Sequence, residues 1–314
     1  MIVVEGFVDR SDLLHPRRIE ALSQRSDGRG LAQLALHAGV LAATGLLVFN
    51  ATGTLWLLPA MVLHGVVLVF LFAALHECTH HTAFEGGWLN ELVAWVAGFL
   101  LVLPPLYFRC FHFTHHRFTQ DPARDPELAV PKPRTLARYL WLASGLPYWG
   151  ERLATTLRHA MTGRIEEPFI PKGARRRVTA EARILWAGYV SVAALSWVVD
   201  PLVPVLFWVV PALLGQPFLR LYLLAEHTGC PMVDDMLANT RTTLTNRLVR
   251  RLAWNMPYHV EHHLFPAIPF YALPAVNMEV QDRLPVVTPG YWAFHHELLH
   301  LLRTNPPRLS GHPG

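Results

Sequence analysis

Long apolar runs, joined by short polar links, occupy much of the first 224 residues of the chain. A run of roughly 20 apolar residues is long enough to cross a bilayer as a helix. We expect four such crossings, at residues 31–49, 55–75, 184–199 and 202–224. Prolines inside the fourth run are compatible with a kinked membrane helix. The predicted fold class is therefore all-α, an integral membrane protein with about four transmembrane helices.

Two further segments are apolar but do not resemble full crossings. Residues 88–103 are too few for a comfortable span and end at two prolines, which indicates a re-entrant or interfacial hairpin. Residues 131–163 mix Pro, Arg and Trp with Leu, which favours an interfacial helix pair over an ordinary loop. The expected organisation is a cytoplasmic N-terminal arm (1–30), a transmembrane helical region (31–230) and a cytoplasmic helical C-terminal region (231–314).

Composition and charge favour a membrane protein over the alternative, a soluble protein with a large apolar core. Only 16% of the residues are charged, against about 25% in soluble domains. No Lys or Arg lies between Arg29 and Arg109, or between Arg183 and Arg220. The basic residues flank the apolar runs, so the net charge of +4 indicates a cytoplasmic membrane face and not a nucleic-acid partner. We expect a multi-pass protein of the cytoplasmic (inner) membrane, with both termini inside.

Histidines provide the candidate chemistry. Of 18 in the chain, ten fall into four groups near the cytoplasmic ends of apolar runs. On a helix, positions i, i+3 and i+4 share a face, whereas an adjacent residue points about 100° away. His81 is therefore placed outside the predicted ligand set. The predicted metal ligands are His76, His80, His112, His115, His116, His227, His259, His262 and His263.

Nine imidazoles suit two metal ions with open positions, because one ion takes four to six ligands. Imidazole binds Zn, Cu, Fe and Ni alike, so the spacing alone does not choose the metal. Neighbouring polar groups could accept the second ring N–H of a ligand and fix its tautomer, although helix capping or surface exposure is the alternative. The residues predicted for this supporting role are His81, Glu77, Glu226, Glu261, Asp121 and Asp125.

The histidine pattern resembles the membrane fatty acid desaturase family and, more distantly, alkane hydroxylases and carotenoid ketolases. The resemblance rests on HxxxH, HxxHH and HxxHH boxes in that order, with a lone histidine before the third, and residues 254–266 are similar to the third box of bacterial desaturases. It implies a di-iron centre, O2 as co-substrate, and insertion of a C=C bond into a fatty acyl or similar lipidic chain. Acyl-CoA desaturases carry an Asn one turn before the lone histidine; here that residue is Leu223, and Asn255 or Glu226 could substitute.

Several alternatives share these residues. A hydroxylase or ketolase of the same fold would use the same boxes, and a branch of the family desaturates amino-acid-derived small molecules, as in rhizobitoxine-type pathways. A metal transporter is disfavoured because transporters hold their ions near the bilayer midplane. The substrate is expected to be lipidic, entering from the bilayer or on an acyl carrier, past aromatic residues such as Phe70, Phe72, Phe218 and Tyr222.

Other features are expected to lie outside the catalytic machinery. No ferredoxin-type cysteine motif or cytochrome-like domain is apparent, so a separate donor, a ferredoxin with its reductase, is expected to supply electrons. The basic clusters at 172–177 and 247–251 could dock it or could bind lipid headgroups. His37 and His64 are expected to form interior hydrogen bonds, and the 295–300 triad to lie on the polar face of a terminal helix. The three cysteines are not expected to bind metal.

Overall fold

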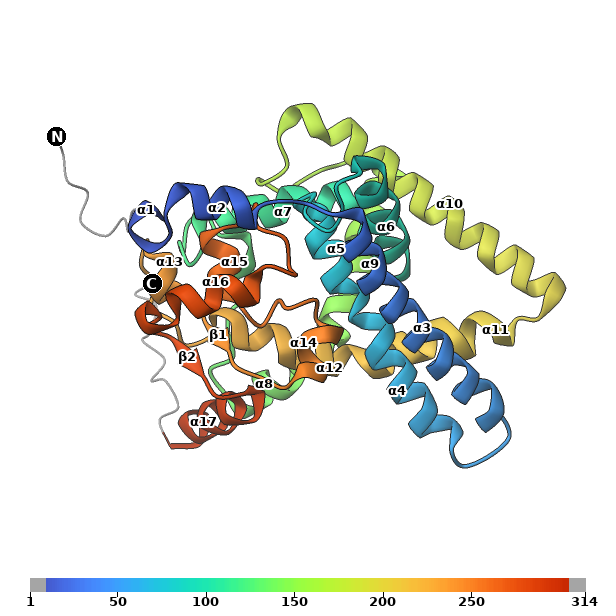
Figure 1. The fold of residues 1–314 in the computed structure, drawn as a ribbon. Helices are drawn as coiled ribbons and strands as arrows, with labels where there is room; N and C mark the ends of the chain where they lie inside the picture. Colours follow the sequence, from blue (N-terminus) through green and yellow to red (C-terminus); the bar gives the residue numbers. More distant parts are fainter. Residues whose placement is uncertain (1–9, 305–314) are drawn as a thin grey trace, which may run out of the picture.

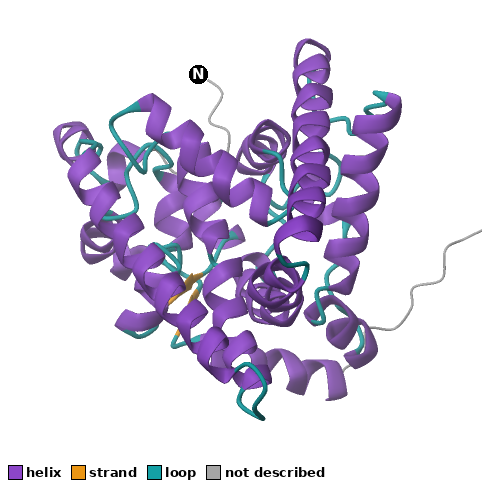
Figure 2. Ribbon diagram, turned by 90° about the vertical axis from the view of Figure 1, so that its right-hand side faces the viewer, coloured by secondary structure: helices purple, strands orange, loops and turns teal. Residues whose placement is uncertain are grey.

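The computed structural model describes residues 10–304. Helices form most of this part of the chain, and its two short strands are minor additions (Figure 2). The all-α prediction is therefore confirmed.

Four helical segments are long and apolar enough to cross a membrane, as the sequence predicts. They are α3 (Asp27–Ala51); α4 (Leu57–Val69) with α5 (Leu71–Thr79); α10 (Arg175–Val199); and α11 (Leu202–Pro204) with η3 (Val205–Val209) and α12 (Val210–His227). The third segment begins well before the predicted residue 184. Hydropathy marks only the apolar part of a helix, whereas the arginines at its start are good helix formers and extend it.

The four segments form two hairpins whose tips lie on the same side of the molecule. In Figure 1 the α3–α4 turn and the α10–α11 turn both project away from the C-terminal elements. Large apolar side chains are exposed at these tips: the exposed fraction is 97% for Leu55 and 82% for Trp197. An apolar surface of this kind is stable in lipid but would aggregate in water. The protein is therefore a multi-pass membrane protein.

The α4 and α12 helices are in backbone contact where Gly65 faces Gly215. A Cβ atom built on Gly215 would lie 2.2 Å from the carbonyl oxygen of Gly65. Small residues at such a crossing let membrane helices approach closely. Since α4 leads into the first histidine box and α12 ends at His227, this crossing sets the distance between two parts of the candidate site.

A sharp bend separates the helices on either side of the two prolines. Helix α6 (Gly87–Leu100) and helix α7 (Pro105–Phe118) meet at 99°, in agreement with a re-entrant or interfacial arrangement. Pro105 starts α7 at a position where its missing N–H removes no helical hydrogen bond. The predicted helix pair is present as α8 (Leu136–Ala143) and α9 (Leu146–Thr162).

The remaining elements gather around the histidine end of the spans (Figure 1). They are α1 (Arg10–Leu13), α2 (Pro16–Leu22), η1 (Pro126–Ala129), η2 (Lys172–Ala174), α13 (Met236–Asn239), β1 (Thr242–Thr243), α14 (Arg247–Leu252), α15 (His259–Leu264), α16 (Leu273–Val280), η4 (Gln281–Arg283), β2 (Val287–Thr288) and α17 (Tyr291–Thr304). Strands β1 and β2 pair in parallel. Arg18 pairs with Glu279 at 2.7 Å, so the N-terminal arm packs on the C-terminal region.

Replacing Gly215 with Ala should force α12 away from α4. Overpacking of this kind costs about 1–3 kcal/mol, so we expect a lower melting temperature and a lower bound-metal content in the purified protein. Gly39→Ala is the matched control, since a Cβ atom there meets nothing within 4 Å. Equal melting temperatures for the two variants would contradict the proposed role of the crossing.

Candidate metal centre

Four helices deliver the nine predicted histidines to one place. His76 lies in the last turn of α5 and His80 caps that helix. The second box lies on α7, His227 is the last residue of α12, and the third box lies on α15. Within each box the i, i+3 and i+4 spacing turns the rings to one side, as expected from helical geometry. The structure therefore brings together histidines that are up to 187 positions apart in the sequence (263 − 76).

Five of the histidines form a first group in which the potential ligand atoms lie within 4.8 Å of one another. The members are His76, His80, His112, His116 and His262. The Nε2 atom of His112 is central: it lies 2.6 Å from that of His76, 2.8 Å from that of His80 and 3.0 Å from that of His116. All nine histidines have buried rings except His80, whose ring is partly covered.

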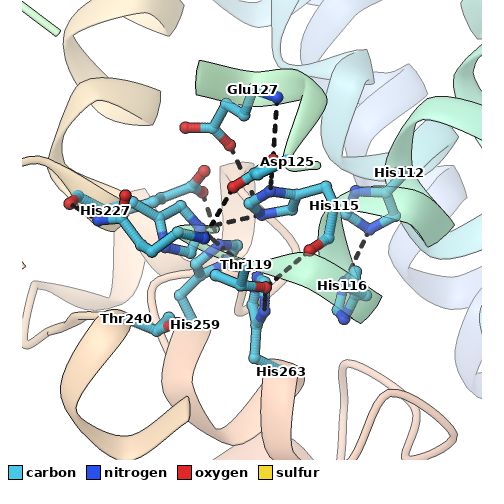
Figure 3. A network of polar contacts seen from close by, with 12 residues as sticks. His112, His115, His116, Thr119, Asp125, Glu127, His227, Thr240, His259 and His263 are labelled. Carbon is cyan, nitrogen blue, oxygen red and sulfur yellow. Dashed lines mark hydrogen bonds and ion pairs between the residues drawn. The ribbon is translucent and has the colours of Figure 1, made fainter. Parts of the chain in front are cut away.

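The other four histidines form a second group beside the first (Figure 3). His115, His227 and His263 meet the same distance criterion. His259 completes the group, because its Nε2 atom lies 3.1 Å from the Nε2 atoms of both His227 and His263. The two groups adjoin where the rings of His116 and His263 stack, with centroids 4.1 Å apart. A five-plus-four division is what two neighbouring metal ions would require.

Hydrogen bonds made by the outer ring nitrogens determine the tautomer of three members of the second group. His115 Nδ1 lies 2.9 Å from Asp125 Oδ1, and His227 Nδ1 lies 3.2 Å from the carbonyl oxygen of Asn239. His263 Nδ1 lies 3.3 Å from the Thr119 hydroxyl. Each of these oxygens can accept an N–H from Nδ1, which leaves the Nε2 lone pair facing the centre of the group. That is the tautomer that binds a metal ion.

The first group also fits a metal ion by its charge state and spacing. Burial, reinforced by Arg109, lowers the pKa of His80 to about 3, and burial lowers the pKa of His262 well below the usual value. Burial has the same effect on the pKa of His259 and His263 in the second group. Neutral imidazole is the form that metal ions bind. Two nitrogens that bind one ion at about 2.1 Å and at right angles lie about 3.0 Å apart, close to the observed separations. The donor set thus fits metal binding.

Two of the carboxylates predicted to support the ligands lie beside them. Asp125 contacts His115 and also accepts a hydrogen bond from the backbone N–H of Gln120 at 2.8 Å. Glu226 Oε1 lies 3.6 Å from His259 Nδ1, beyond ordinary hydrogen-bond length but close enough to orient the ring electrostatically. Leu223, at the position of the Asn of acyl-CoA desaturases, lines the adjacent cavity.

The other residues predicted for the supporting role have different partners. Glu77 accepts hydrogen bonds from Thr82 and from the backbone N–H of Phe270. Asn255 donates to the carbonyl oxygen of the same Phe270, so both residues attach the segment after the third box. Glu261 accepts from Thr242 and Asn277 and thereby fixes α15 to β1 and α16.

Two predicted supporting residues face away from the groups. His81 is partly exposed and pairs with Glu91 at 3.1 Å, as its angular position on the helix suggests. Asp121 pairs with Arg124. Neither residue contacts any of the nine histidines among the interactions of the described residues.

Glu127 is a site residue that the sequence analysis missed. Its Oε2 atom lies 3.5 Å from His115 Nε2, on the side of the second group that faces Asp125 (Figure 3). Burial alone would raise the pKa of Glu127, but Lys132 and the imidazoles of His115 and His227 outweigh burial and hold this pKa well below its ordinary value. A charged carboxylate therefore points at the group that has only four histidines.

A cavity of about 450 Å³ reaches the histidines from one side, within the size range of small-molecule sites. His76, His112, His115 and His259 form its inner end. The Phe72 and Phe108 rings stack on the His76 and His112 rings there. Phe70, Phe72 and Tyr222 line the cavity as predicted, whereas Phe218 is not part of its wall and is 47% exposed.

The histidines outside the groups have structural contacts. His37 lies 2.9 Å from the carbonyl oxygen of Val67 and accepts a hydrogen bond from Trp254. His64 bonds Thr44 and the carbonyl oxygen of Phe207. These contacts agree with the predicted interior hydrogen bonds. On α17, His296 and His300 are exposed, and none of the three cysteines belongs to either histidine group.

Comparison with known proteins shows that this chain is similar in sequence to desaturases. A family model described as fatty acid desaturase matches residues 54–295, which contain all nine histidines. A dihydrorhizobitoxine desaturase of Bradyrhizobium elkanii is 29% identical over 257 residues, covering 75% of this chain and 70% of the relative. An sn-1 oleoyl-lipid 12-desaturase of Picosynechococcus is 25% identical over 236 residues (69% and 67%). A Delta(12)-acyl-lipid-desaturase of Punica granatum is 27% identical over 266 residues (74% and 66%).

Asp125→Asn should weaken metal binding without removing a ligand. Loss of a supporting carboxylate typically lowers metal affinity or activity by about 10- to 100-fold. The matched control is Asp121→Asn, four residues away and also followed by Pro, which should retain wild-type metal affinity. Affinity is measured by competition with a chelator, and equal losses in the two variants would contradict the role given to Asp125.

Proposed function

The chain belongs to the fatty acid desaturase family, and from this premise we propose that it uses two iron ions and O2 to introduce a C=C bond into a lipidic chain. Proteins of this family are oxidoreductases, so the chain is an enzyme. The observation that supports the proposal is the pairing of a five-histidine and a four-histidine group beside a cavity whose wall includes four of these histidines. When bound, the iron pair would supply the O2 activation needed to remove hydrogen from an unactivated C–H bond.

The nine proposed iron ligands are the histidines predicted from the sequence. His76, His80, His112, His116 and His262 would hold one ion, and His115, His227, His259 and His263 the other. The protein contributes by positioning the substrate: the cavity orients the substrate and excludes water from the part that the histidines line. Whether the second hydrogen is also removed depends on where the next C–H bond lies. A hydroxylase of the same fold therefore remains the alternative, with the same ligands and a different substrate position.

The substrate is proposed at the level of a lipidic or similar apolar chain. The names of the relatives point to two classes, acyl lipids and dihydrorhizobitoxine, and the second supports the alternative class of amino-acid-derived substrates. Either class must present a saturated segment to the histidines that line the cavity, beside the packed Phe72 and Phe108 rings.

We place the active site on the cytoplasmic side of the inner membrane. The turns at 50–56 and 200–202 carry no Lys or Arg, whereas the opposite ends of the spans carry Arg29 and Lys172. A surface hollow lined by Arg29, Arg247, Arg250 and Arg251 lies near the third box and would attract an acidic electron donor such as a ferredoxin.

Glu127 is proposed as a further ligand of the four-histidine ion, because its carboxylate faces His115 and His227. Glu127→Gln should lower the stoichiometry from about two towards one tightly bound iron per chain, since an amide is a weaker ligand than a carboxylate. Glu151→Gln is the matched control: this glutamate lines the same cavity but pairs with Arg152. Full iron content in the Glu127 variant would exclude it as a ligand.

The proposed function is tested by expressing the chain in a host of defined lipid and metabolite composition. We expect products that have lost two hydrogens, detected by mass spectrometry, whereas hydroxylation would add an oxygen atom. His262→Ala should abolish the product and reduce iron content, while His300→Ala, an exposed histidine of α17, should change neither. Wild-type product formation by the His262 variant would refute the ligand assignment, and zinc without O2-dependent activity would refute the oxidase.

A further inference from the structure

One of the charged residues that line the cavity lies on a membrane helix, at a distance from His227. Arg220 lies within the fourth span, seven residues before His227, and its side chain lines the cavity. At 1.5 Å per helical residue, the two positions are about 10 Å apart along α12. An ionisable residue inside a membrane span is costly and usually serves a ligand or a transported ion.

Most of the other charged residues that line the cavity have ionic partners, whereas Arg220 forms no ion pair with a described residue. Lys132 pairs with Glu127, Arg152 pairs with Glu151, and Glu167 pairs with Arg158 and His159. Glu226 faces His259. No carboxylate of the described residues lies within 4.0 Å of the Arg220 guanidinium. Once these pairs are matched, Arg220 and Glu226 are the charged wall residues that form no ion pair with a Lys, Arg, Asp or Glu of the described chain, and no ion pair joins the two to each other.

The guanidinium of Arg220 is held in place by neutral groups. The ring of Tyr148 lies 4.4 Å from its central carbon, a cation–π contact. With the Gln216 amide turned so that its oxygen faces Arg220, that oxygen accepts from Nε at 3.0 Å and from Nη2 at 3.2 Å. Gly145 makes room for this arrangement, because a Cβ atom there would lie 2.5 Å from the Gln216 side chain. The remaining N–H groups of Arg220 are left for another acceptor.

From this we infer that Arg220 binds a carboxylate of the substrate, with the alkyl segment of the substrate extending towards the histidines. The inference rests on the proposed function and narrows its substrate class to molecules that carry a free carboxylate, in contrast to neutral acyl esters. A carboxylate accepts two parallel N–H bonds from a guanidinium, and the low-dielectric surroundings strengthen the contact. The distance from Arg220 to His227 fixes which carbon atoms of the chain reach the reacting position.

The test compares two ligands of equal size on the purified full-length protein in lipid nanodiscs. Octanoate and octanamide are titrated calorimetrically without O2 or reductant. We expect octanoate to bind about tenfold more tightly, the usual gain from a hydrogen bond to a charged group. Equal affinity for the acid and the amide in the wild-type protein would overturn the inference, and this comparison requires no variant.

Variants identify the residue responsible for the preference. Arg220→Gln should remove the preference for the acid while leaving octanamide binding unchanged, and Arg220→Lys should keep part of it. Arg176→Gln, an exposed arginine of α10, should retain the wild-type preference. An acid preference that persists in Arg220→Gln would assign the carboxylate to another group, such as a bound metal ion, and overturn the inference. Since binding is measured without turnover, acid binding through Arg220 with no alkene product would overturn the desaturase proposal alone.

Discussion

The structure is organised around the buried ring nitrogens of nine histidines, whose lone pairs point towards one another in the interior of the protein. Burial keeps the imidazoles of His80, His259, His262 and His263 neutral. Asp125, Asn239 and Thr119 can accept the outer N–H groups of His115, His227 and His263. The inner nitrogens then face one another at close to 3 Å, an arrangement that is repulsive unless cations lie between them. A soluble core would fill such a space with apolar side chains. The repulsion between these closely spaced ring nitrogens is explained if they are arranged to bind metal ions.

The membrane helices bring these histidines together because contacts between the helices fix the positions of the helix ends. The Gly65–Gly215 contact places α4 and α12 at backbone distance, and the histidines follow at the ends of the segments that they lead into. The bend between α6 and α7 turns the second box back over the end of the spans. Glu77 and Glu261 then hold the third box from behind through Phe270, Thr242 and Asn277. Two conspicuous acidic neighbours of the boxes thus contribute to stability rather than to chemistry.

The sequence predicts those features that repeat with a helical period. The spans follow from apolar runs, and eight of the nine grouped histidines follow from i, i+3 and i+4 spacing, which the helices reproduce; the lone His227 follows from its place at the end of an apolar run. Features set by the path of a loop are not accessible in this way. Asp121 and Asp125 both precede a proline, yet only Asp125 turns towards His115, because the short η1 turn directs it inward. Glu127 lies in that same turn, where no periodic signal marks a residue as facing the site.

Arg220 illustrates a different limit of sequence analysis. In the sequence it marks only the end of a stretch without basic residues, four residues before the end of the predicted fourth span. Its meaning depends on α9, which is far away in the sequence and places Tyr148 beneath the guanidinium. Under the proposed binding of a substrate carboxylate, the Arg220 guanidinium and the histidines would hold two separate parts of the substrate in one cavity. Binding at two points would hold a flexible chain at one position relative to the metal ligands. That position determines whether a second hydrogen is removed or an oxygen atom is added.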